Sequence, residues 1–117
     1  AWFGLVRDTF NSLADRLPES FFPAIYRRFE DTDVWRVYED VKPTLQWLKQ
    51  AGLPAGVISN WDDRLPPLLE KLGLRERFQS LTVSFATGFT KPDARMFSMT
   101  AEQLGVPPDA VLHIGDS

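Results

Sequence analysis

The chain has 117 residues, of which 44% are hydrophobic and 25% charged, and it contains no cysteine. These values exclude a collagen, a disulfide scaffold and a disordered tail, and they are typical of a soluble globular domain. Thirteen Lys and Arg against sixteen Asp and Glu give a net charge of -3, so we expect no nucleic acid and no membrane as a partner. The sequence has neither a signal segment nor a long apolar run, and on that ground we expect a cytoplasmic protein.

The first 36 residues predict two amphipathic helices. Apolar residues recur every three or four positions from Trp2 to Leu17, and Pro18 ends this pattern. A second set with the same spacing runs from Phe21 to Phe29. Two such helices cannot bury both apolar faces alone, so we expect residues 1–36 to form a small helical subdomain with a common aromatic core.

From residue 37 onward, predicted helices and strands alternate. The pattern predicts helices at 43–50, 64–72 and 93–104, and short apolar strands at 55–58, 80–85 and 110–114. The three helices are followed by Gly52, Gly73 and Gly105, which are typical helix ends. Strands separated by helices form a parallel sheet, so the predicted fold class is α/β.

Polar residues follow two of the predicted strands. Ser59-Asn60 follows the first strand and Gly115-Asp116-Ser117 the third, while Lys91-Pro92-Asp93 opens the last helix. Ligands of open parallel sheets bind beyond the carboxyl ends of the strands. Each of these residues alone is an ordinary turn or surface residue. Together, hydroxyl and amide donors, a Lys cation and an Asp carboxylate are what a phosphate and Mg²⁺ require.

Three segments of the chain resemble motifs of the haloacid dehalogenase-like hydrolase superfamily. They are Val57 to Asn60, Lys91 to Phe97 and His113 to Ser117, which are similar in order and spacing to the family's second, third and fourth motifs. The resemblance covers essentially the whole chain. It implies an incomplete Rossmann-like parallel sheet at residues 37–117, preceded by part of a helical cap at residues 1–36.

The resemblance also implies an activity, namely Mg²⁺-dependent hydrolysis of a small phosphorylated metabolite through an aspartyl-phosphate. By motif matching, Ser59 would hydrogen-bond the transferring phosphoryl group, with Asn60 beside it. Lys91 would neutralise the charge of the phosphate and of the nucleophile. Asp116 would help to hold Mg²⁺, and Ser117 is a further candidate next to it.

The family's first motif, Asp-x-Asp on a strand, has no counterpart in the sequence. Asp31-Thr32-Asp33 has the bare spacing but follows a predicted helix, so we do not expect it to be the nucleophile. The family also has an acidic metal ligand several residues beyond Gly-Asp, and the sequence stops at Ser117 before that position. We therefore expect a fragment that hydrolyses no phosphomonoester by itself. Without the first-motif strand, residues 55–60 and 110–114 would either face a gap or pair with each other, and an unpaired apolar edge is an aggregation hazard.

Two alternatives to a phosphatase remain open. A non-catalytic binding or interaction module fits the missing first motif, and the aromatic residues of the first 36 would then be a partner surface. A 2-haloacid dehalogenase uses the same aspartate chemistry without a metal, but a metal carboxylate at Asp116 would serve no purpose in it. Trp61 either roofs the site or packs on a neighbouring helix, and His113 is expected to be packed within its strand. The sequence indicates neither the substrate nor the oligomeric state.

Overall fold

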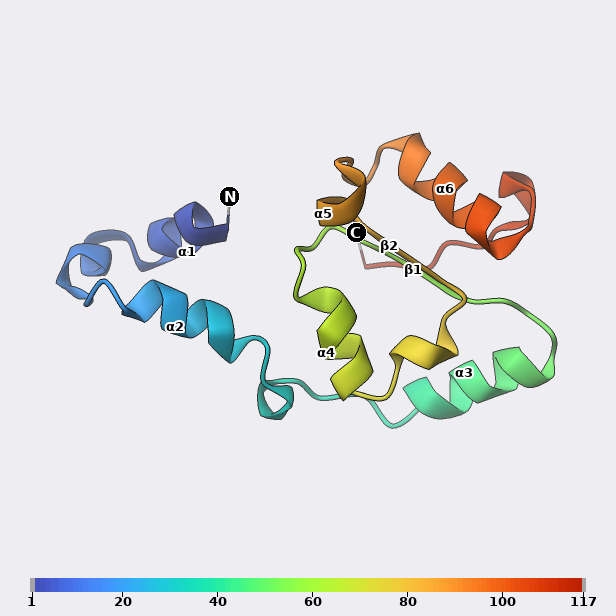
Figure 1. The fold of residues 1–117 in the computed structure, drawn as a ribbon, viewed down its shortest axis with the longest axis horizontal. Coiled ribbons are helices and arrows are strands. Elements are labelled where there is room, and N and C mark those ends of the chain that lie inside the picture. The colour runs from blue at the N-terminus through green and yellow to red at the C-terminus, as the bar shows by residue number, and fades with distance from the viewer. Residues whose placement is uncertain (1, 117) are drawn as a thin grey trace. The chain divides into compact units, whose positions relative to one another are not determined.

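The computed structural model describes residues 2–116. The chain divides into two compact units, Ala1–Arg36 and Val37–Ser117, and Figure 1 shows the order of their elements. Among the described residues, no helix is both long enough and apolar enough to cross a membrane.

The first unit contains the helices α1 (Trp2–Phe10) and α2 (Phe21–Arg28), with 3-10 turns at Asn11–Arg16 and Thr32–Val34. The sequence predicts one continuous helix up to Leu17, but α1 ends at Phe10. The reason is that Asn11 has a φ of 44°, in the left-handed region through which a right-handed helix cannot continue.

Aromatic rings join the two helices of the first unit. Trp2 and Tyr26 meet edge to face with ring centroids 5.0 Å apart, and Phe10 and Phe21 do so at 5.1 Å. Edge-to-face geometry is favourable because the positive edge of one ring meets the negative face of the other. The predicted aromatic stripes therefore do pack on one another.

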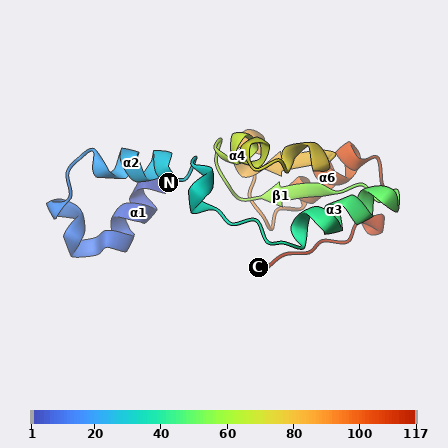
Figure 2. The ribbon, with the colours of Figure 1, turned by 90° about the horizontal axis from the view of Figure 1, so that it is seen from below.

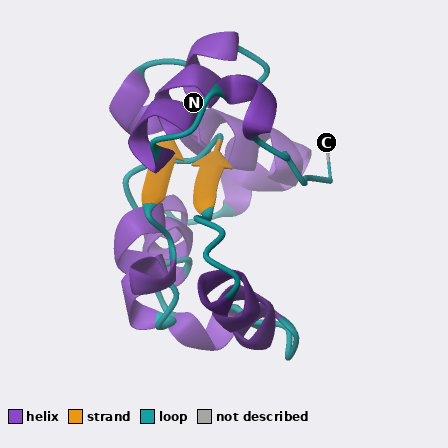
Figure 3. Cartoon of the chain, turned by 90° about the vertical axis from the view of Figure 1, so that its right-hand side faces the viewer, coloured by secondary structure: helices purple, strands orange, loops and turns teal. Residues whose placement is uncertain are grey.

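The second unit is built on a parallel pair of strands. The strands are β1 (Gly56–Ser59) and β2 (Ser80–Val83), and the helices are α3 (Val41–Gln50), α4 (Leu65–Lys71), α5 (Ser84–Thr87) and α6 (Ala94–Leu104). Short 3-10 turns lie at Arg75–Arg77 and Pro108–Ala110. Figure 1 shows α6 on one side of the strands and α3 and α4 on the other, and in Figure 2 β1 runs between α4 and α3. The two strands point the same way (Figure 3), so the predicted α/β class with a parallel sheet is confirmed.

The helix ends of this unit follow the predicted signals. Gly73 ends the turn after α4 with a φ of 68°, and Gly105 ends α6 with a φ of 70°. Glycine adopts this left-handed conformation without steric cost. At the start of α6, the carboxylate of Asp93 accepts a hydrogen bond of 2.9 Å from the backbone N–H of Arg95, which is the predicted cap.

The helix α6 lies close against the sheet through small and polar side chains. The hydroxyl oxygens of Thr82 and Thr100 are 2.6 Å apart, and both residues are buried. Thr100 donates its one hydroxyl proton to the carbonyl oxygen of Met96 at 2.8 Å, so Thr82 must be the donor to Thr100. Gly56 permits this close approach, because a Cβ there would lie 3.1 Å from Ser80 Cβ and 3.2 Å from Thr100 Cγ2.

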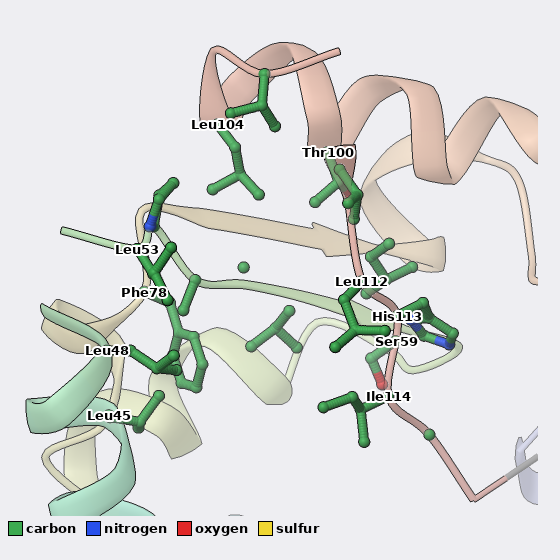
Figure 4. Close-up of a pocket in the computed structure, with 18 of the residues that line it drawn as sticks. Leu45, Leu48, Leu53, Ser59, Phe78, Thr100, Leu104, Leu112, His113 and Ile114 are labelled. Carbon is green, nitrogen blue, oxygen red and sulfur yellow. The ribbon is translucent and has the colours of Figure 1, made fainter. Parts of the chain in front are cut away.

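The prediction of a third strand at residues 110–114 is wrong. Residues 111–116 have no regular secondary structure, although Val111 is extended with a φ of -97° and a ψ of 124°. In Figure 4, Leu112 and Ile114 point to one side of the segment and His113 to the other. Within the described residues, this segment makes no backbone hydrogen bond to β1, because a cavity lies between them. Of the two expected arrangements, the structure therefore has the gap.

Candidate functional site

A cavity of about 820 Å³ lies along the edge of β1 that has no ladder partner within residues 2–116, which is called the free edge below. Leu45 and Leu48 of α3 form part of its wall, and Leu104 of α6 forms another part (Figure 4). Leu112 and Ile114 also line it, although these two residues are 83% and 84% exposed. The cavity is therefore a largely apolar slot with a strand on one side and an extended segment on the other.

Three of the four predicted site residues line this same cavity. They are Ser59 at the end of β1, Lys91 in the loop before α6, and Asp116 in the final segment. Ser59 and Lys91 are half-buried, whereas Asp116 is exposed. A hydroxyl donor, an ammonium and a carboxylate are thus available to one ligand in the cavity. Ser117, the further candidate beside Asp116, lies outside the described residues.

The fourth predicted residue, Asn60, does not line the cavity. The backbone N–H of Lys91 donates to Asn60 Oδ1 at 2.6 Å, and Asn60 Nδ2 donates to the carbonyl oxygen of Lys91 at 3.2 Å. The side-chain amide therefore binds both backbone groups of a residue 31 positions further along the chain.

The loop that carries Lys91 is also braced on the side of α6. The guanidinium of Arg95 lies over the ring of Phe89, 3.7 Å from its centroid, and donates to Asp93 Oδ2 at 2.6 Å. The hydrogen bonds from the Arg95 side chain and backbone lower the pKa of Asp93 to about 2. Sequence reasoning found Asp93 as a cap but missed the brace, because nothing in the sequence pairs Arg95 with Phe89.

The described residues do not complete a metal site by themselves. Within residues 2–116, no group of three or more His, Cys, Asp or Glu side chains is placed to hold a metal ion. Asp116 is the one carboxylate among the described residues that line the cavity. Mg²⁺ requires near-octahedral oxygen coordination. The described residues would supply one carboxylate ligand to such an ion, that of Asp116.

The carboxylates of Asp31 and Asp33 are both paired with Arg28. Arg28 Nη1 lies 2.9 Å from Asp31 Oδ2 and 2.6 Å from Asp33 Oδ1, and Arg28 Nη2 donates to Asp33 Oδ2 at 2.8 Å. These hydrogen bonds lower the pKa of Asp33 and raise the pKa of Arg28. The segment also follows α2 rather than a strand, so its two carboxylates pair with a neighbouring cation.

Two aromatic residues near the motifs differ in their placement. His113 is exposed instead of packed in a strand, and its ring and that of Phe97 are perpendicular with centroids 5.2 Å apart. Trp61 is not among the residues that line the cavity. Its carbonyl oxygen accepts hydrogen bonds from the backbone of Phe85 and from Ser84 Oγ, which ties the end of β1 to α5.

The α/β fold with its parallel strands is consistent with the hydrolase family that the three motifs resemble. The family model for haloacid dehalogenase-like hydrolases matches residues 2–117, and the chain belongs to this family. This confirms the resemblance carried by the three motifs.

Several curated proteins are similar to the chain. Haloacid dehalogenase-like hydrolase domain-containing protein 3 of Bos taurus is 37% identical over 99% of this chain and 47% of its own length. Phosphoglycolate phosphatase of Agrobacterium fabrum is 34% identical over 97% of this chain and 52% of its own length. N-acetylmuramic acid 6-phosphate phosphatase of Pseudomonas aeruginosa is 34% identical over 69% of this chain. The chain spans about half the length of the first of these relatives.

Proposed function

We propose that this chain is part of a phosphatase that acts on a small phosphomonoester. The observation that carries the proposal is that Ser59, Lys91 and Asp116, which come from three separate motifs, line one cavity. Two similar proteins, each 34% identical, are named as phosphatases of small phosphorylated compounds. The activity is proposed for the whole protein, because the chain spans about half the length of relatives that it matches.

In the proposed reaction, Ser59 Oγ donates a hydrogen bond to a phosphoryl oxygen, and the ammonium of Lys91 neutralises the negative charge there. A carboxylate oxygen of one aspartate attacks phosphorus, the bond to the alcohol oxygen breaks, and that oxygen takes a proton from the carboxylic acid of the second aspartate of the same motif. Water then releases inorganic phosphate from the aspartyl-phosphate. Both aspartates belong to the family's Asp-x-Asp strand, for which we propose the cavity beside β1.

We also propose Mg²⁺ as the cofactor of the whole protein, with Asp116 as one of its ligands. The charge of Mg²⁺ would offset that of the phosphate. Because the described residues supply a single carboxylate, the reaction above assigns no step to the ion.

The test is the hydrolysis of p-nitrophenyl phosphate by the whole protein with and without Mg²⁺. We expect Mg²⁺-dependent turnover, and we expect Lys91→Ala and Asp116→Asn each to lower kcat/KM by roughly a hundredfold or more, as the loss of a charge-stabilising group does. Lys49→Ala and Asp109→Asn change the same residue types at exposed positions outside the cavity. These two control variants are expected to keep the activity of the parent protein.

The 117-residue chain by itself is expected to release no phosphate. Turnover by this chain that Asp116→Asn abolishes would contradict that expectation. Metal-independent release of halide from a 2-haloacid by the whole protein would favour a dehalogenase instead. A whole protein without either activity would favour a non-catalytic binding module.

A further inference from the structure

We propose that Asn60 is a positioning residue that holds the backbone of Lys91 and does not itself contact the phosphate. This deepens the proposed function, on which the kinetic part of its test rests. It also replaces the role that motif matching implies for Asn60, which is a place beside the phosphoryl group.

The hydrogen-bonding capacity of Asn60 is directed at Lys91. Its Oδ1 accepts from the N–H of Lys91 at 2.6 Å, and its Nδ2 donates to the carbonyl oxygen of the same residue at 3.2 Å. This pair of bonds requires an acceptor and a donor on one planar group, and the short Asn side chain carries both. An Asp at this position would lack the donor, and an Ala would lack both groups.

The position of Asn60 in the chain explains why its side chain does not line the cavity. It directly follows Ser59, the last residue of β1, and successive side chains of an extended chain point in opposite directions. Ser59 lines the cavity and Asn60 does not. The two neighbours therefore have different tasks, one toward the cavity and one toward the Lys91 loop.

The two hydrogen bonds fix the backbone position from which the long Lys91 side chain extends. Lys has a compact charge on a flexible four-carbon stem, so its ammonium is placed only as well as its Cα is placed. The two bonds from Asn60 tie that backbone to the end of β1, which also carries Ser59. They thereby fix the position of the Lys91 ammonium relative to the Ser59 hydroxyl. A small displacement of catalytic groups lowers the reaction rate considerably.

Gln79 offers a matched control at the opposite end of β1. Its Oε1 accepts a hydrogen bond of 2.7 Å from the backbone N–H of Ala55, and its own N–H donates to the Ala55 carbonyl oxygen at 2.8 Å. Gln79→Ala thus removes a side-chain bond to the backbone next to the same strand, at the end opposite Asn60 and Lys91. It tests whether any loss of such a bond has the effect expected for Asn60→Ala.

The first measurement is backbone amide hydrogen exchange at Lys91 in the whole protein, with urea midpoints recorded for each variant. In Asn60→Ala we expect the Lys91 amide to exchange roughly tenfold faster, since its acceptor is lost. In Gln79→Ala we expect the Lys91 amide to exchange as in the parent protein. Unchanged exchange at Lys91 in Asn60→Ala overturns the proposal, whether or not the protein is a phosphatase.

The second measurement is a double-mutant cycle on kcat/KM for p-nitrophenyl phosphate. We expect Asn60→Ala to lower kcat/KM roughly ten- to hundredfold in the parent protein, and to have no further effect in a Lys91→Ala background. A loss of the same size in both backgrounds means that Asn60 acts on the substrate directly, which overturns the proposal. A parent protein without phosphatase activity contradicts the proposed function, and the exchange result at Lys91 then decides the position of Asn60.

Discussion

Asp93 combines a cap and an ion pair at the first turn of α6. Its Oδ1 accepts from the backbone N–H of Arg95 at 2.9 Å, and both of its oxygens accept from the Arg95 side chain. These bonds favour the charged carboxylate, which is why its pKa falls from 3.8 to about 2. A group whose pKa is lowered on folding stabilises the fold above its unfolded pKa and loses that contribution as the pH falls toward its folded pKa.

The pH dependence of this pair is testable with Asp93→Asn, which keeps an oxygen for the cap but removes the charge. The difference in free energy of unfolding between the parent protein and the variant is expected to be constant above about pH 5 and to shrink between about pH 4 and pH 2. Urea denaturation of the whole protein over this pH range measures it. Arg95→Gln removes the cation but keeps the backbone N–H at position 95, so it should lose only the side-chain part of this pH dependence, which is the larger part. A difference that does not vary with pH would contradict the assignment.

At the scale of single residues, the sequence indicates the type of group but not its partner. Ser59, Lys91 and Asp116 are found from motif order, and they do line one cavity. Asn60 is found by the same matching, yet its amide bonds to the backbone of Lys91. No single-sequence pattern shows that pairing, because the two residues are 31 positions apart and the bond depends on how two loops meet.

At the scale of elements, the contact of α6 with the sheet depends on a chain of buried hydroxyls. Thr82 donates to Thr100, and Thr100 donates to the carbonyl oxygen of Met96. Both hydroxyl donors therefore have an acceptor, although Thr82 and Thr100 are only 1% and 3% exposed. A buried hydroxyl that keeps its partner costs little, whereas one that loses its acceptor carries its full desolvation cost.

This order of donors predicts unequal effects for two similar substitutions. Thr100→Val removes the acceptor of Thr82 and is expected to destabilise the fold by about 1–3 kcal/mol. Thr82→Val leaves Thr100 still bonded to Met96, so it should cost less, and the double variant should be more stable than the sum of the two losses indicates. Urea denaturation of the four proteins measures the cycle, and equal, additive losses would show that the hydroxyls are not coupled.

The helix end at Gly105 and the paired strands β1 and β2 are predicted, whereas the break at Asn11 and the unpaired state of residues 110–114 are not. The end of α6 at Gly105 follows from backbone geometry within a few residues, and the structure has it there. The break of the first helix at Asn11 is missed, because apolar spacing continues across it up to Leu17. Residues 110–114 have the composition of a strand and are extended from Val111, but a strand also requires a hydrogen-bonded neighbour.

At the scale of the whole molecule, the cavity is lined by an edge of the sheet and by exposed apolar side chains. Leu112 and Ile114 are more than four-fifths exposed, and β1 has a ladder partner on one side within the described residues. An apolar edge of this kind favours association with another chain. The same side chains become buried if the family's first-motif strand fills the cavity, as proposed above.

The same double substitution is expected to have different effects in the 117-residue chain alone and in a whole protein whose cavity is filled by a strand. Leu112→Glu combined with Ile114→Glu is expected to reduce self-association of the 117-residue chain, which sedimentation velocity over a range of concentrations measures. In the whole protein the pair should destabilise the fold by several kcal/mol, since it buries unpaired charges. Trp47→Glu, on an exposed residue of α3 outside the cavity, should show neither effect. A whole protein that tolerates the double substitution would contradict the filled cavity.

The strand β1 is tied at both ends to distant parts of the chain by hydrogen bonds between a side chain and the backbone. Gln79 bonds to Ala55 just before β1, and the Asn60 amide just after it bonds to Lys91. Ordering the backbone of one residue costs about 1–2 kcal/mol in conformational entropy. Since β2, Gln79 and the Asn60–Lys91 bonds already order β1, a strand that docks on its free edge pays this cost for its own residues alone. The free edge is in this sense preorganised, which would favour tight docking of the first-motif strand proposed above.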